Sequence, residues 1–166
     1  MVGLDFSDPL TYTGIGNTVF DLSVNTYRGT LTNGPKFTND KNGGIIFDGV
    51  DDRIDFSSNL SNIIYNNFSF EFVAKPNATI TTTAESTSGI AGASGKRYII
   101  EPTNEGSNGG FGIALGTNAI ECIEHGGSYL PVLLSHSANL SDINHYCVVV
   151  NDKKSRLYIN GVLIKE

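Results

Sequence analysis

The chain has 166 residues, and 11 Lys and Arg stand against 17 Asp and Glu, so its formal net charge is −6. A negative surface repels phosphate backbones, which argues against nucleic-acid binding. No apolar run approaches the length of a membrane span, and the segment after Met1 lacks the basic and apolar regions of a signal peptide. A length of 166 residues is typical of a single domain, so we expect one domain, 1–166. We expect it to bind neither nucleic acid nor membrane.

Alternation of apolar and polar residues predicts a series of short β-strands. The clearest is 68–74, where Phe68, Phe70 and Phe72 share one face. Helix is expected at most as one turn near 57–64. In chain order, the predicted strands are 2–6, 27–32, 44–47, 53–56, 68–74, 89–93, 97–101, 111–115, 119–123, 145–151, 156–159 and 162–165.

Turn chemistry separates these strands. Asn33-Gly34, Asn42-Gly43, Asp48-Gly49 and Asn160-Gly161 supply residues that tolerate a positive φ. The stretches 79–88 and 103–110 are polar and rich in small residues, so we expect long surface loops there. Many strands joined by tight turns predict an all-β sandwich.

The chain has two cysteines, Cys122 and Cys147, which are too few for a disulfide scaffold or a closed zinc site. We expect both to be small core residues. A disulfide would require their strands to lie side by side.

Three stretches of the chain occur together in a known family. They are Asp21-Leu22-Ser23, then 29–35 (GTLTNGP), then 47–52 (FDGVDD). Within DLSVNTYRGTLTNGP and GGIIFDGVDDRIDF they resemble the laminin-G-like, concanavalin A-like lectin jelly-roll domain. The segments 68–76 and 145–164 are similar to two further strands of that family. The resemblance implies a two-sheet antiparallel jelly-roll sandwich.

The family continues beyond the hairpin at Asn160-Gly161 with a closing strand that this sequence lacks. We expect truncation rather than a strand supplied by another chain, although both readings stay open. The opening segment 2–33 is similar to the version of the domain found in structural proteins of marine tailed phages. Bacterial surface proteins carry the same family.

The resemblance implies a non-catalytic binding or adhesion module that recognises a glycan or surface polysaccharide. Its expected location is the virion surface, as a capsid decoration or tail appendage, or else the extracellular or bacterial cell surface. The alternative is a structural domain that cements other proteins of the same particle, and a homo-oligomer is open in either case.

A glycoside hydrolase is the enzymatic alternative on this fold, and it needs two carboxylates flanking one bond. The nearest pair, Glu121 and Glu124, should point to opposite faces of one strand. We therefore expect no catalytic residues.

A sugar site usually combines an aromatic ring with polar hydrogen-bonding groups. The expected ring is Tyr129, with His125, Asn104 and Asn108 as polar partners in neighbouring loops. The competing reading is that Tyr129 packs at the edge of the sandwich.

Asp48, Asp51 and Asp52 form the best candidate metal site, because calcium prefers several carboxylate and carbonyl oxygens. The same residues would also suit a tight turn, with carboxylates capping backbone amides. We expect no required cofactor, and calcium is the one metal that this cluster suits.

Overall fold

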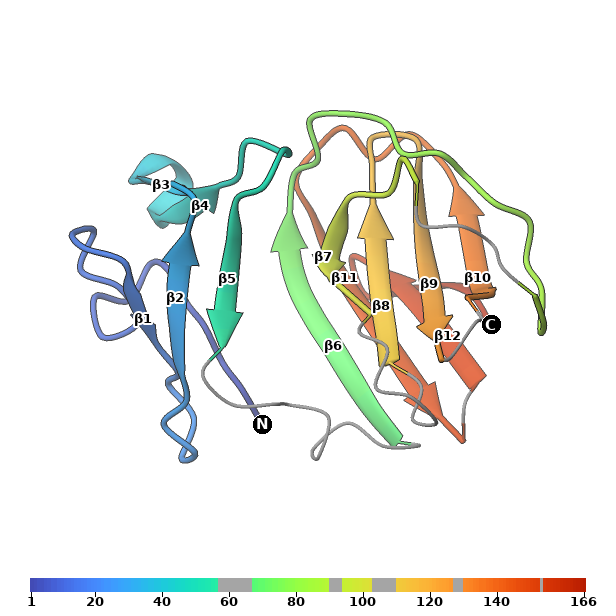
Figure 1. Ribbon diagram of the computed structural model, residues 1–166, viewed down its shortest axis with the longest axis horizontal. Helices are drawn as coiled ribbons and strands as arrows, with labels where there is room; N and C mark the ends of the chain where they lie inside the picture. Colours follow the sequence, from blue (N-terminus) through green and yellow to red (C-terminus); the bar gives the residue numbers. More distant parts are fainter. Residues whose placement is uncertain (57–66, 90–93, 103–109, 127–129, 153) are drawn as a thin grey trace. The chain divides into compact units, whose positions relative to one another are not determined.

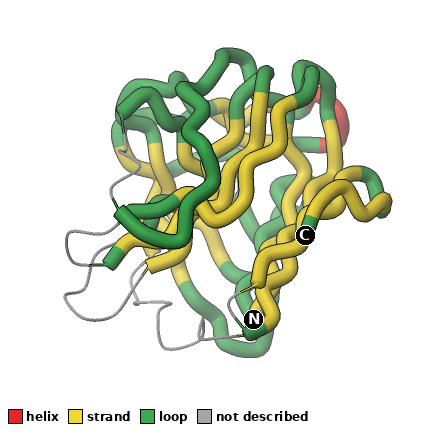
Figure 2. The backbone as a smooth tube through the Cα atoms, turned by 90° about the vertical axis from the view of Figure 1, so that its right-hand side faces the viewer, coloured by secondary structure: helices red, strands yellow, loops and turns green. Residues whose placement is uncertain are grey.

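The computed structural model describes residues 1–56, 67–89, 94–102, 110–126, 130–152 and 154–166. The chain divides into two compact units, Met1–Ile63 and Ile64–Glu166. Among the described residues the one helical segment is a 3-10 turn, Asp40–Asn42, and the rest are strands and their connections (Figure 2). The predicted all-β class is thus confirmed.

The first unit contains a three-stranded antiparallel sheet and a separate hairpin. The sheet order is β1 (Thr18–Phe20), β2 (Arg28–Thr32) and β5 (Arg53–Phe56), and the hairpin joins β3 (Lys36–Thr38) to β4 (Gly44–Ile46). Its small core centres on Tyr12, Val19 and Leu31. Gly29 on β2 has no room for a side chain, because a Cβ there would lie 2.7 Å from methyl groups of Val19 and Ile54.

Residues 2–6 do not form the predicted strand. Gly3 instead donates its N–H to the Asp21 carboxylate at 2.8 Å and accepts a hydrogen bond from the Leu22 N–H. Asp21 also accepts the Ser23 N–H at 2.8 Å, so one carboxylate organises this corner. The backbone N–H and carbonyl of Gly3 therefore find their partners in the Asp21 side chain and the Leu22 N–H, and residues 2–6 do not join a sheet.

The second unit contains two four-stranded antiparallel sheets. We call the first the β7–β10 sheet; its order is β10 (Val132–Ser137), β9 (Ala119–His125), β8 (Gly110–Leu115) and β7 (Tyr98–Ile100). The other has the order β13 (Val162–Lys165), β12 (Lys154–Ile159), β11 (Asn144–Asn151) and β6 (Asn67–Ala74) (Figure 1).

The two sheets of the second unit enclose a shared hydrophobic core, which makes this unit a β-sandwich. Ile113, Ile120 and Leu134 from one sheet pack with Tyr146 and Leu157 from the other, and all five are buried. Aromatic rings join the sheets directly. Phe111 lies edge-to-face on Phe68, with ring centroids 5.2 Å apart, and stacks on Phe70 at 6.0 Å. The predicted face of alternating phenylalanines is therefore the inner face of β6.

The second face of the β7–β10 sheet is also covered. We call residues 78–89 the strap, because this segment without strand structure lies over that face. Ile80 of the strap is 5% exposed and packs with Ala114, Ala119, Ile123 and Val132. Burial on both faces explains why β9 is almost continuously buried, as expected for a strand without a solvent face.

Most predicted strands are present within a residue or two of their predicted ends, and three others were missed: β1, β3 and β10. Strand β10 has the sequence VLLSHS and does not alternate regularly, because its register shifts between Val132, which packs under the strap, and Leu134, which belongs to the sandwich core. The predicted helical turn at 57–64 and most of the predicted strand at 89–93 lie outside the described residues.

Candidate functional site

His125 is the last residue of β9 and lies at one end of the β7–β10 sheet. It pairs with Gly110, the first residue of β8. Its ring is half-buried, and Nδ1 lies 3.1 Å from the carbonyl oxygen of Pro102. Pro102 and Gly110, the described residues on either side of 103–109, therefore both lie beside His125.

The other three predicted ligand residues, Asn104, Asn108 and Tyr129, lie outside the described residues. Of the four predicted ligand residues the structure therefore describes His125, and a site made of all four stays a prediction.

Asp48, Asp51 and Asp52 form a compact acidic turn in the first unit. One carboxylate oxygen from each lies within 4.8 Å of the others. The carboxylates already serve the turn, because Asp48 accepts the Val50 N–H at 2.8 Å and Asp52 accepts the Asp48 N–H at 2.8 Å. The first of these hydrogen bonds is the main reason that the pKa of Asp48 lies below its ordinary value.

Hydrogen bonds therefore support the interpretation that these carboxylates stabilise the turn. The interpretation that they bind calcium is supported by the spacing of their oxygen atoms alone. Calcium takes six to eight oxygen ligands, so three carboxylates would need carbonyl or water oxygens as well. The carboxylate oxygens of the cluster are ligands of the kind that calcium prefers. A calcium titration of the folded chain distinguishes metal binding from a purely structural turn.

The carboxylates of Glu121 and Glu124 do not share a face of β9. Glu121 follows the side of Ala119 and Ile123, which face the strap, whereas Ile120 and Cys122 belong to the sandwich core. Glu121 is completely buried and its carboxylate pairs with the Lys96 ammonium, whose side chain is 1% exposed. This carboxylate is sealed from solvent and cannot flank a glycosidic bond in this state.

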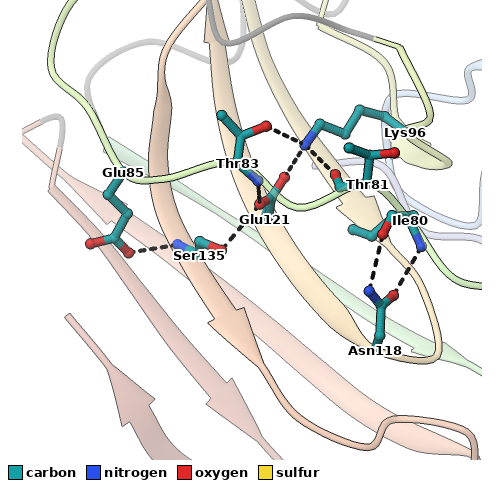
Figure 3. A network of polar contacts seen from close by, with 8 residues as sticks. All are labelled: Ile80, Thr81, Thr83, Glu85, Lys96, Asn118, Glu121 and Ser135. Carbon is teal, nitrogen blue, oxygen red and sulfur yellow. Dashed lines mark hydrogen bonds and ion pairs between the residues drawn. The ribbon is translucent and has the colours of Figure 1, made fainter.

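The Glu121–Lys96 pair is the centre of a polar network under the strap (Figure 3). Glu121 also accepts the Thr83 N–H at 2.7 Å and the Ser135 hydroxyl at 3.1 Å. Lys96 donates to the Thr81 carbonyl at 2.6 Å and to the Thr83 hydroxyl at 3.0 Å. Both buried charges are thus paired and hydrogen-bonded, which is the condition under which they are tolerated.

Sequence reasoning missed this network. The available signal was a glutamate in the middle of the apolar strand AIECI, because a buried carboxylate needs a cation. The sequence did not indicate which cation pairs with Glu121, because Lys96 lies 25 residues away from it in the chain.

The two cysteines lie in different sheets and are both free. Burial raises the pKa of Cys122 to about 12, and it also raises the pKa of the half-buried Cys147. The core reading is correct for Cys122, whereas Cys147 lies on the outer side of β11, opposite Glu71.

Comparisons with known proteins give no match: no family model, no curated protein and no solved structure is similar to this chain. The part of the chain that the structure describes contains no helix that is long and apolar enough to cross a membrane.

Proposed function

We propose that the chain is a non-catalytic binding and adhesion module that recognises a glycan or surface polysaccharide. Its ligand contacts come from His125, at one end of the β7–β10 sheet, and from Tyr129, Asn104 and Asn108, which lie outside the described residues. The module is displayed on a virion surface, as a capsid decoration or tail appendage, or on a cell surface.

The observation that carries this proposal is the position of His125 beside Pro102 and Gly110. Gly110 pairs with His125 and Pro102 contacts its ring, and the sequence predicts a polar surface loop at 103–110. Loops on a rigid sheet are the usual position for binding residues. The buried state of Glu121 supports a non-catalytic role, because a solvent-sealed carboxylate does not reach a substrate.

The test is binding of the folded chain to a glycan array, followed by titration of the best glycan against variants. We expect saturable binding, and Tyr129→Ala should weaken it about tenfold or more, which corresponds to about 1.4 kcal/mol. Tyr158→Ala is the matched control, because Tyr158 lies on β12 in the other sheet. Absence of binding from a chain that melts cooperatively would remove the glycan proposal.

The calcium question is decided in the same assay. The array is run with calcium and again with a chelator, and Asp51→Asn is compared with the unchanged chain, because no turn hydrogen bond to the Asp51 side chain is seen among the described residues. A calcium-dependent rise in melting temperature that Asp51→Asn abolishes would establish metal binding. Equal melting with calcium and chelator would leave the acidic turn as purely structural.

A second candidate, a structural protein that cements neighbouring subunits, is favoured by β13. This edge strand exposes three apolar residues: Val162 (61%), Leu163 (49%) and Ile164 (37%). Exposed apolar edge strands promote association with other chains. Light scattering after size-exclusion chromatography tests this role, and a dimer that Leu163→Lys dissociates would favour it.

A further inference from the structure

The strap is held on the β7–β10 sheet through its backbone and through a few of its own side chains, of which Glu85 accepts the Ser135 N–H at 2.6 Å and pairs with Lys165 at 2.6 Å. Side chains of the sheet and of Lys96 bind the backbone at residues 80–83. Asn118, in the turn between β8 and β9, accepts the Ile80 N–H at 2.9 Å and donates to the Ile80 carbonyl at 3.0 Å. Lys96 binds the Thr81 carbonyl, and Glu121 binds the Thr83 N–H. These contacts therefore bind backbone groups of Ile80, Thr81 and Thr83.

One side chain of the strap provides the apolar anchor. Ile80 is 5% exposed and fills a site formed by Ala114, Ala119 and Ile123. Small alanine side chains on the sheet leave the space that the isoleucine occupies. Backbone hydrogen bonds combined with a pocket for a single side chain are how strand-like peptides are usually recognised.

The floor of this site does not depend on the strap for its own charge balance. The Glu121 carboxylate and the Lys96 ammonium pair with each other, and Ser135 on β10 donates its hydroxyl to Glu121. If the strap were displaced, the face would present a paired carboxylate and ammonium, an amide from Asn118 and a small apolar pocket. These are complementary to the N–H and C=O groups of another peptide.

We propose that this face is a peptide-binding groove that the strap fills in cis and that an extended segment of a partner protein enters when the strap is displaced. The partner segment carries an isoleucine followed by small hydroxyl residues, as the strap does at 80–83. The inference is separate from glycan binding, because it concerns a different ligand and a different part of the second unit.

The strap competes with any partner at a high effective concentration, which is of millimolar order for tethered segments. The test therefore weakens the strap and leaves the groove unchanged. The variant Ile80→Ser removes the anchor from the strap, and the probe is a fluorescent peptide with the sequence of residues 78–88. Binding is followed by anisotropy.

We expect saturable binding to Ile80→Ser that is at least about tenfold tighter than binding to the unchanged chain. A peptide with serine in place of its isoleucine should not bind, and adding Asn118→Ala to the variant should weaken binding by a similar factor. No binding at millimolar peptide to an Ile80→Ser chain that melts cooperatively would overturn the proposal.

A second measurement keeps the proposal falsifiable if Ile80→Ser does not fold. Hydrogen exchange on the unchanged chain compares the amides of Thr81, Thr83 and Ser86 with those of β9. Local opening of the strap predicts exchange at least about tenfold faster than in β9 and nearly independent of denaturant. Equal exchange in both would mean that the strap leaves only on global unfolding, and the groove would then never be available.

Discussion

Removal of the buried cation under the strap should be among the most destabilising single changes in the second unit. Lys96→Met keeps most of the side-chain volume but leaves the Glu121 carboxylate, which is 0% exposed, without its counter-ion. Breaking a buried ion pair from one side costs about 3–5 kcal/mol, because the remaining charge is uncompensated. For a chain of this size each kcal/mol lowers the melting temperature by about 2–4 °C, so we expect a fall of about 6–20 °C.

The double variant Lys96→Met with Glu121→Gln provides the matched comparison. It removes both charges and retains a carbonyl oxygen that accepts the Thr83 N–H. Replacement of a buried pair by neutral groups is often close to neutral, so the double variant should recover most of the loss. Arg53→Met is the exposed control, because Arg53 and Asp55 are 52% and 49% exposed, and its expected cost is about 0–1 kcal/mol.

The assay is urea unfolding followed by far-ultraviolet circular dichroism, with free energies taken from linear extrapolation. Two results would refute the reasoning. One is a cost below about 1 kcal/mol for Lys96→Met, since a buried unpaired charge cannot be that cheap. The other is a double variant whose loss equals the sum of the two single losses, because coupled residues should not be additive.

Three further predictions concern separate parts of the chain. Gly112→Ala should lower the free energy of unfolding in urea by about 1–3 kcal/mol, because the added Cβ would lie 2.7 Å from Cγ of Pro102 and the proline ring cannot move freely. An unchanged free energy of unfolding would mean that the backbone at Pro102 shifts to make room. Burial raises the pKa of Asp21, but its hydrogen bonds outweigh this and hold the pKa below the ordinary value. Its stabilising contribution is therefore present above about pH 4 and is lost as the pH falls through the lowered pKa. Asp21→Asn should flatten the fall in unfolding free energy below about pH 4, and an unchanged slope would contradict this. At pH 8 a thiol reagent should label the half-buried Cys147 before Cys122, whose pKa is about 12, and equal rates in the folded chain would show that the core opens.

Local patterns predicted the strands well where one face is apolar and the other polar. Strand β6 has this character, with Phe68, Phe70 and Phe72 inward and Glu71 outward; its predicted start differs from the structure by one residue and its predicted end agrees. The hairpin through Asn160 and Gly161 was equally clear, because its turn needs a positive φ at both positions and both have one. The same reasoning failed at residues 2–6, where Gly3 bonds to the Asp21 carboxylate and to the Leu22 N–H and no strand is formed.

The candidate sites divide in the same way. The separation of Glu121 and Glu124 onto two faces follows from the period of a strand, and the structure agrees with it. The turn role of Asp48 and Asp52 also follows from local chemistry, because their hydrogen bonds span only a few residues. The strap was expected to be a surface loop. This was wrong in one respect, because the Ile80 side chain is buried and the Ile80 N–H donates to the Asn118 side chain.

The sequence by itself therefore determined the all-β class, most of the strand boundaries, the tight turns and the opposite faces of neighbouring residues, because these depend on neighbours in the chain. Only the tertiary structure decided which carboxylate is buried, which lysine neutralises it and which face the strap covers. Those outcomes rest on contacts between residues 14 to 38 positions apart, such as Ser135 and Lys96 with Glu121 and Asn118 with Ile80. No local period encodes such pairings; they arise when folded strands bring distant side chains to one place.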